Sequence, residues 1–239
     1  MKRALVTGGS AGIGLAICRA FLDAEYEVIL LDRQPSTIQH ARLRTIIVDL
    51  SDTTATTQAA REATRDPVTT VVHNAGIIRP ALLEQASVDD LATLSRLHLG
   101  AALLLVQAAL PAMRAAGSGR IVLIASRAVL GLATRTAYSA TKAGLIGMAR
   151  TWALELGPDG ITVNAVAPGP IAGTAMFHDV LPPGDTRIDA LANSIPVRRL
   201  GAPEDVARAV MFLADPASGF ITGQTLFVCG GTSIGSLGL

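Results

Sequence analysis

The sequence contains few aromatic residues, few charged residues and only two cysteines. Aromatic residues make up 3% of the 239 residues and charged residues 16%, whereas hydrophobic residues make up 50%. A disordered chain combines low hydrophobicity with high net charge, so this composition excludes that class. Cys18 and Cys229 form no Cys-x2-Cys motif and no ligand cluster with histidines. We therefore expect neither a disulfide scaffold nor a metal site.

The chain also lacks a strong net charge. Its 20 basic and 19 acidic side chains leave a formal net charge of +1. A charge of this size does not attract nucleic acid or an anionic membrane. One uncharged stretch, residues 97–113, is close to the shortest length that spans a bilayer, but it contains His98, Gln107 and Pro111. We interpret it as a buried helix and expect a cytoplasmic protein with no membrane or nucleic-acid partner.

Short runs of branched apolar residues recur along the chain. Most are continuous rather than alternating, which is typical of strands covered on both faces. The predicted strands are residues 3–7, 27–31, 45–48, 69–73, 120–125, 162–167 and 225–228. Stretches rich in alanine, leucine and arginine lie between them and predict helices at residues 13–24, 88–116, 139–156 and 203–213.

This alternation of strands and helices predicts the fold class. Parallel strands need crossover connections, and right-handed crossovers place helices on both faces of a sheet. We expect an α/β protein with a doubly wound, seven-stranded parallel sheet and helices on both faces. No linker rich in proline, serine or glycine divides the chain, so residues 1–239 are predicted to form one domain. Within it, the proline-rich residues 170–199 are predicted to form a substrate loop or lid.

The first predicted strand leads directly into a glycine-rich segment, Thr7 to Gly14, which opens a helix. Gly8 allows a tight turn, Gly12 allows the backbone to approach a pyrophosphate, and Gly14 allows the helix to pack closely on the strand. The positive end of the helix attracts the anion. The segment is therefore a candidate dinucleotide-binding loop. The alternative is a surface turn without a ligand.

The residue at the end of the second predicted strand, Asp32, indicates which dinucleotide binds. A carboxylate there accepts hydrogen bonds from the hydroxyls of the adenosine ribose and repels a 2′-phosphate. Ala11 lacks the basic side chain that favours NADP, whereas the neighbouring Arg33 is able to pair with a 2′-phosphate. We expect NAD rather than NADP.

Tyr138 and Lys142 lie four residues apart on a predicted helix, so their side chains share one face of it. A free tyrosine has a pKa of about 10, and an ammonium group nearby favours its phenolate. Tyr138 is then a candidate general base for an alcohol or general acid for a ketone. Ser126 follows the fifth predicted strand, at the edge where such sheets bind ligands. The alternatives are an exposed helix face and a serine that only caps the strand end.

These motifs, in this order, resemble the short-chain dehydrogenase/reductase family, and the resemblance covers nearly the whole chain. The family pattern Thr-Gly-x3-Gly-Ile-Gly stands at residues 7–14, and an Asn-Ala-Gly follows the fourth predicted strand. The resemblance implies a Rossmann-like fold that binds a nicotinamide dinucleotide. It assigns cofactor binding to Gly8, Ser10, Gly12, Ile13, Gly14, Asp32, Asp49, Leu50, Asn74, Ala75, Gly76, Tyr138, Lys142, Pro168, Gly169 and Ile171.

The resemblance also implies individual roles. Asp49 is expected to contact the adenine ring, Ile171 to meet the nicotinamide carboxamide through its backbone, and Lys142 to bind the nicotinamide ribose. The residues by themselves leave alternatives open. Asp49 is also able to cap the next turn, and Asn74 is able to hold its loop by hydrogen bonds to the backbone.

The chain departs from the family pattern at one position. The family usually has an asparagine on the long helix before the catalytic serine, where it supports a water chain from the lysine. Aligning on Gln107 and Pro111 places His98 there. A neutral imidazole both donates and accepts hydrogen bonds, so His98 is a candidate catalytic residue in a proton relay. The alternative is a buried histidine that a backbone carbonyl satisfies.

We therefore predict an oxidoreductase that transfers a hydride between NAD(H) and a secondary alcohol or ketone. Ser126 would hold the reacting oxygen, Tyr138 would move its proton, and Lys142 would lower the pKa of the tyrosine. The alternatives are an NADPH-dependent 3-oxoacyl reductase and a dinucleotide-binding regulator without catalysis. The resemblance further implies a homotetramer or homodimer.

The substrate is not selected by the sequence. Met176 and Phe177 in the predicted lid could form an apolar wall or simply pack. Three arginines are candidate contacts for a carboxylate or phosphate of the substrate, although each is also able to reach solvent: Arg79, Arg127 and Arg135.

Overall fold

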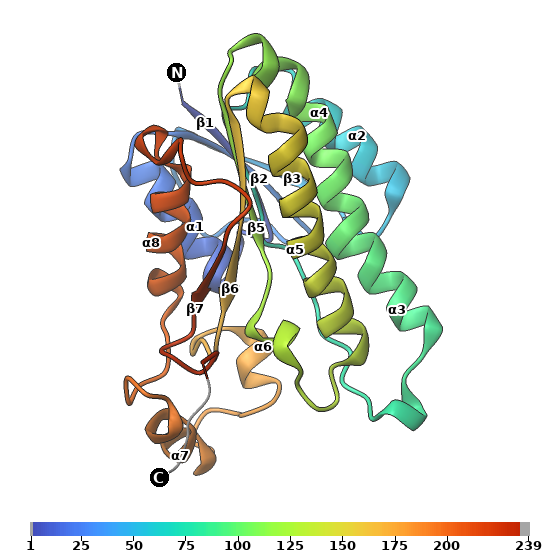
Figure 1. Ribbon diagram of the computed structural model, residues 1–239, viewed down its shortest axis with the longest axis vertical. Helices are drawn as coiled ribbons and strands as arrows, with labels where there is room; N and C mark the ends of the chain where they lie inside the picture. The colour runs from blue at the N-terminus through green and yellow to red at the C-terminus, as the bar shows by residue number, and fades with distance from the viewer. Residues whose placement is uncertain (1, 235–239) are drawn as a thin grey trace.

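The computed structural model describes residues 2–234, in which seven strands form one parallel sheet (Figure 1). The strands are β1 (Arg3–Thr7), β2 (Glu27–Asp32), β3 (Leu43–Ile47), β4 (Thr70–His73), β5 (Gly119–Ile124), β6 (Ile161–Pro168) and β7 (Thr225–Val228). Their order in the sheet is β3-β2-β1-β4-β5-β6-β7. The predicted doubly wound, seven-stranded parallel sheet is confirmed.

Helices connect the strands and cover both faces of the sheet (Figure 1). They are α1 (Gly12–Asp23), α2 (Thr53–Ala63), α3 (Val88–Ser95), α4 (Ala101–Ala115), α5 (Thr136–Leu156), α6 (Ala175–His178), α7 (Arg187–Ser194) and α8 (Pro203–Ala214). Helices α1 and α8 pack together on one face, whereas α2, α4 and α5 lie on the other.

Two apolar cores lie on the two faces of the sheet, and β1 contributes to both. Leu5 packs into the core beneath α2, α4 and α5, whereas Ala4 and Val6 pack into the core beneath α1 and α8. Because successive side chains of a strand point to opposite faces, a strand covered on both faces must be apolar at every position. This explains why β1 is a continuous apolar run.

The predicted helix over residues 88–116 is interrupted in the structure. A π-helical turn, η2 (Arg96–Gly100), separates α3 from α4. A π-helical turn accommodates an extra residue without ending the helix, so the apolar pattern of the sequence continues through it. The turn carries His98, whose side chain is fully buried.

Strand β3 begins at Leu43 rather than at the predicted residue 45, and it ends at Ile47. It is an edge strand that pairs only with β2, and Arg44 and Ile47 are exposed. An edge strand does not need apolar residues at every position, so its first residues do not read as an apolar run.

The stretch Val88–Ala115 is long and apolar enough to cross a membrane by length and composition. In the structure Leu105, Ala109 and Met113 of this stretch are buried against the sheet. A helix that covers a buried sheet needs an apolar face, and that face accounts for the hydropathy.

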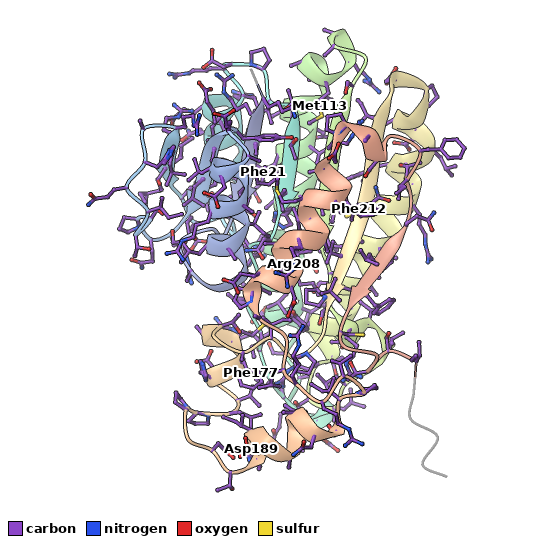
Figure 2. All side chains as sticks on the ribbon, turned by 90° about the vertical axis from the view of Figure 1, so that its left-hand side faces the viewer. Phe21, Met113, Phe177, Asp189, Arg208 and Phe212 are labelled. Atoms are coloured by element: carbon purple, nitrogen blue, oxygen red, sulfur yellow. The ribbon has the colours of Figure 1, made fainter. Side chains whose placement is uncertain are left out.

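A long segment follows β6 at the carboxyl end of the sheet. Helices α6 and α7 lie in it and extend beyond the ends of the strands (Figure 1). Figure 2 shows Phe177 of α6 and Asp189 of α7 in this part, far from Phe21 of α1 and Met113 of α4, which pack on the sheet. Strand order reverses between β1 and β4, and in such sheets a crevice opens at that point.

Candidate active site

The carboxyl ends of the strands surround a cavity of about 220 Å³. Its walls come from the ends of β4, β5 and β6, from α5 and from the segment around α6. Half of the predicted site residues line it: Ile13, Asn74, Gly76, Ser126, Tyr138, Lys142, Pro168, Gly169 and Ile171. Asp32 and Asp49 are not part of this lining and lie after β2 and β3. A separate cavity of about 280 Å³ lies between Ile195, Val197 and the end of β7, and Ser126, Tyr138 and Lys142 do not line it.

The loop between β1 and α1 fits the pyrophosphate of a dinucleotide. Gly8 and Gly12 have φ angles of +66° and +52°, in the left-handed region that favours glycine. A Cβ atom on Gly14 would lie 2.0 Å from the carbonyl oxygen of Gly8, so only glycine lets the helix approach this closely. Ala11 precedes α1 and offers no side-chain cap, which leaves the first amides of the helix for an anionic ligand.

Asp32 is held in place at the end of β2 by two backbone amides. Its Oδ2 accepts a hydrogen bond from Ser10 N at 3.0 Å, and its Oδ1 accepts one from Gln34 N at 3.1 Å. Each carboxylate oxygen has a further lone pair, so both remain able to accept a hydrogen bond from a ribose hydroxyl. The hydroxyl of Ser10 donates to Gln34 O at 2.7 Å and stiffens the same corner.

Asp49 forms a local turn after β3. Its Oδ1 accepts hydrogen bonds from the backbone and the hydroxyl of Ser51, at 2.8 and 2.7 Å, and these bonds lower the pKa of the exposed carboxyl. The cap of α2 is instead Asp52, which accepts from Ala55 N. The neighbouring Leu50 is buried.

The end of β4 is tied to the end of β1. Asn74 Nδ2 donates to the carbonyl oxygens of Gly8 at 2.8 Å and Thr7 at 3.2 Å, so this side chain has the architectural role that the sequence left open. The hydroxyl oxygen of Thr7 accepts the amides of Asn74 and Ala75, both at 3.0 Å. Since two amides donate to this oxygen, its own proton goes to Nδ1 of His73 at 3.1 Å.

Gly76 follows at a point where no side chain fits. A Cβ atom there would lie 2.9 Å from His98 Nε2 and 3.3 Å from Lys142 Nζ. The imidazole and the ammonium therefore face the same small space beside Gly76. The family resemblance implied that His98 lies near Lys142, and the structure shows that they face each other beside Gly76.

Ser126, Tyr138 and Lys142 converge on the cavity. Ser126 Oγ accepts a hydrogen bond from Ala128 N at 3.1 Å, so it caps the short helix after β5, and it lines the same cavity as the tyrosine. Tyr138 is 8% exposed, and its hydroxyl points to Met176 Sδ at 3.8 Å. Lys142 Nζ donates to Ile124 O at 2.6 Å and lies 5.8 Å from the centre of the tyrosine ring.

Burial dominates the electrostatics of this cluster. It raises the pKa of Tyr138, and the nearby Ser126 hydroxyl and the charge of Arg135 oppose that rise. Burial lowers the pKa of Lys142 to about 7, because little water remains to solvate the ammonium. Around neutral pH the lysine is therefore divided between its two protonation states.

The buried His98 has both ring nitrogens engaged. Ile77 N donates to Nε2 at 3.3 Å, so the ring proton is on Nδ1, which donates to the hydroxyl oxygen of Thr141 at 2.8 Å. Burial lowers the pKa of His98 to about 2, with further lowering by Lys142 and His73. The imidazole is thus neutral at physiological pH. Thr141, between Tyr138 and Lys142 on α5, was not selected by the sequence analysis, because a threonine inside a helix carries no motif.

The turn after β6 forms the opposite wall. Gly169 N donates to Val228 O at 2.9 Å, and a Cβ atom on Gly169 would lie 2.8 Å from Cys229 Cα. Ile171 lies opposite Gly201 in a parallel β-bridge. The two hydrogen bonds of the bridge are made by the residues on either side of Ile171: Gly201 N donates to Pro170 O, and Ala172 N donates to Gly201 O. The backbone of Ile171 itself therefore points away from the bridge.

The segment over the cavity is tied to this turn by Thr174. Its hydroxyl donates to Ile171 O at 3.1 Å and accepts Phe177 N at 3.2 Å, which caps α6. Met176 and Phe177 line the cavity and form the apolar wall that the sequence suggested. The hydrogen bonds of Thr174 connect α6 to the residues expected at the nicotinamide.

Comparison with known proteins agrees with this geometry. The family model described as "Enoyl-(Acyl carrier protein) reductase" matches residues 8–233. A (2S)-[(R)-hydroxy(phenyl)methyl]succinyl-CoA dehydrogenase subunit of Thauera aromatica is 37% identical over 97% of this chain and 96% of its own. An acetoacetyl-CoA reductase of Rhizobium meliloti (strain 1021) is 39% identical over 95% of this chain and 97% of its own.

Solved structures show the same fold and family. A short chain dehydrogenase/reductase family protein is 35% identical, with a TM-score of 0.87 over 98% of both chains. A blue fluorescent protein from a metagenomic library, in complex with NADPH, is 33% identical, with a TM-score of 0.83 over 96% of this chain and 97% of the other. The glycine-rich loop, the Ser–Tyr–Lys cluster and these relatives together show that the chain belongs to the short-chain dehydrogenase/reductase family, whose members are NAD(P)-dependent oxidoreductases.

Proposed function

We propose that the protein transfers a hydride between NAD(H) and the 3-hydroxy or 3-oxo group of an acyl thioester. The observation that carries the proposal is the convergence of Ser126, Tyr138 and Lys142 on one cavity beside the glycine-rich loop. The names of the two curated relatives contain acyl-CoA compounds, which supports a thioester substrate. Residues 170–199 are proposed to act as the lid of this site, within a single domain of residues 1–239.

The mechanism follows from the positions of the three side chains. A bound nicotinamide supplies the hydride acceptor or donor. Ser126 Oγ holds the substrate oxygen by a hydrogen bond, and Tyr138 takes the proton of that hydroxyl on oxidation or returns it to the oxygen on reduction. Lys142, which is anchored to Ile124 O, binds the ribose and stabilises the phenolate when it is protonated.

Replacing the tyrosine tests this mechanism against a binding protein without catalysis. In Tyr138→Phe the proton acceptor is lost while the ring and its packing remain. We expect turnover of 3-hydroxybutyryl-CoA with NAD to fall about 10²- to 10⁴-fold. The dissociation constant for NADH, measured by fluorescence, should change less than about threefold. Unchanged turnover in this variant contradicts the mechanism, and a wild-type protein that binds NADH without turnover favours the regulator.

The proposed preference for NAD is based on Asp32, because a carboxylate at the end of β2 repels a 2′-phosphate. Two observations favour NADP instead: Arg33 is able to pair with a 2′-phosphate, and one structural relative was solved in complex with NADPH. We expect kcat/KM with NAD to exceed that with NADP by about tenfold or more, and Asp32→Ser to reduce this ratio by a similar factor, because repulsion of the phosphate is removed. A wild-type preference for NADP identifies the NADPH-dependent 3-oxoacyl reductase instead.

We infer that His98 is a positioning residue rather than a proton relay. Its two ring nitrogens are engaged by Ile77 N and by the hydroxyl of Thr141, and through Thr141 the ring holds α5. The asparagine that the family usually has is able to make similar hydrogen bonds. His98→Asn should therefore retain most of the turnover, whereas His98→Ala should lose it.

The pH dependence of stability tests whether His98 stays neutral in the folded protein, and the pH profile of kcat tests whether it titrates during turnover. The unfolded chain protonates His98 below a pH of about 6.5, whereas the folded protein does not until about pH 2, so stability falls as the pH drops between these values. We expect the free energy of unfolding to fall less steeply in His98→Asn than in the wild type between pH 6 and 4, by up to about 1.4 kcal/mol per pH unit. Chemical denaturation measures this. If instead the pH profile of kcat shifts by one unit in His98→Asn, His98 titrates during turnover.

We further infer a homo-oligomer, a tetramer or a dimer, in the cytoplasm. Leu103 of α4 and Leu154 of α5 are 40% and 82% exposed, and large apolar side chains of this kind favour a partner surface. Both cysteines are free, which suits a reducing compartment. Sedimentation velocity should give a mass of two or four chains, and a stable monomer at micromolar concentration contradicts this assignment.

A further inference from the structure

The candidate active site contains a cation that the proposed mechanism does not use. Arg135 lines the cavity together with Leu132, Tyr138 and apolar residues of the lid. Apart from Lys142, whose ammonium is anchored to Ile124 O, it is the only lysine or arginine in the described lining. A guanidinium presents a planar, rigid fork of N–H donors, which matches the geometry of a carboxylate.

The backbone holds Arg135 at a fixed place relative to the tyrosine. It immediately precedes α5, three residues before Tyr138. Thr134 has a φ of +65°, a conformation that threonine rarely adopts, and its carbonyl oxygen accepts Ala81 N at 3.0 Å. Arg135 forms a bridge with Ala81 as well. These contacts position the first turn of α5 and the arginine together.

The charge of Arg135 is not neutralised by the described part of the chain. Its Nη1 donates to the hydroxyl oxygen of Thr134 at 2.5 Å, and no carboxylate of residues 2–234 lies within 4.0 Å of it. Nε and Nη2 have no hydrogen-bond partner among these residues. An arginine offers five N–H donors, so most of them remain for a ligand.

The other two arginines that the sequence suggested are placed differently. Arg79 pairs with Asp90 at 3.4 Å and is half exposed. Arg127 follows Ser126, but its Nη1 donates to Thr232 O at 3.4 Å, and it does not line the cavity. Of the three arginines, Arg135 therefore lines the cavity, whereas Arg79 and Arg127 bind partners outside it.

We propose that Arg135 binds a free carboxylate of the substrate, so that the acyl chain carries this carboxylate within a few bonds of the reacting carbon. This inference rests on the proposed function of the cavity. A guanidinium and a carboxylate form two parallel, charge-assisted hydrogen bonds, which fix distance and orientation together. Arg135 and Tyr138 then hold two ends of one short substrate, and the apolar lid strengthens the pairing by excluding water.

Matched ketones test the proposal with purified wild-type enzyme, Arg135→Gln, Arg135→Lys and the control Arg79→Gln. The probes are acetoacetate and levulinate, which carry a carboxylate, and their ethyl esters, which do not. We expect Arg135→Gln to raise KM for the acids about tenfold or more and KM for the esters less than about twofold. Arg135→Lys should recover part of the loss, and Arg79→Gln should match the wild type.

Two kinetic outcomes overturn the proposal. Equal losses with acids and esters in Arg135→Gln, together with a shifted pH profile, show that the arginine acts only through Tyr138, whose pKa its charge lowers. A loss confined to acetoacetyl-CoA shows that it binds the phosphates of coenzyme A instead.

Calorimetric titration of the NADH complex with acetoacetate makes the test independent of turnover. We expect binding to the wild type that weakens about tenfold or more in Arg135→Gln. If the wild type binds the acid but reduces none of the probes, the proposed function fails while the carboxylate site stands. If acid binding is absent from the wild type, or equal in the two proteins, the carboxylate site is wrong.

Discussion

The hydroxyl of Thr7 joins the ends of β1 and β4, the two strands between which the strand order reverses, and the active site depends on this junction. Its oxygen accepts hydrogen bonds from the backbone amides of Asn74 and Ala75. The side-chain amide of Asn74 in turn donates to the carbonyl oxygens of Thr7 and Gly8. The connections after β1 and β4 leave towards opposite faces of the sheet, and in such sheets a crevice opens at this point. The glycine-rich loop and Gly76 are thereby held on two sides of one crevice.

Burial then sets the charges within that crevice. The same loss of water lowers the pKa of Lys142 to about 7 and that of His98 to about 2, and raises that of Tyr138. A neutral imidazole beside the lysine adds a hydrogen-bond acceptor without adding repulsion. His73, also fully buried, has its pKa lowered to about 3, and its Nε2 has no hydrogen-bond partner among the described residues. The two buried histidines behind the reacting groups are thus polar but uncharged.

The parts that the sequence predicted well are those that local chemistry decides. The apolar run of β1 requires a strand covered on both faces, and the positive φ angles of Gly8 and Gly12 require glycine. The four-residue spacing of Tyr138 and Lys142 places them on one side of any helix. By contrast, the π-helical turn at 96–100 and the helices α6 and α7 did not follow from the pattern. A π-helical turn keeps the apolar periodicity, and short helices in a proline-rich segment depend on caps such as Thr174.

The sequence by itself determined the fold class, the dinucleotide loop and the candidate Ser–Tyr–Lys set, because each depends on residue type at a short, fixed spacing. Only the tertiary structure decided which residues meet across the site. His98 and Lys142 lie 44 positions apart in the sequence and share the space beside Gly76. Of three candidate arginines, the packing of loops around the cavity admits Arg135 alone, since Arg79 and Arg127 find partners elsewhere. Contacts between distant segments depend on how the layers pack, and that packing leaves no local signal in the chain.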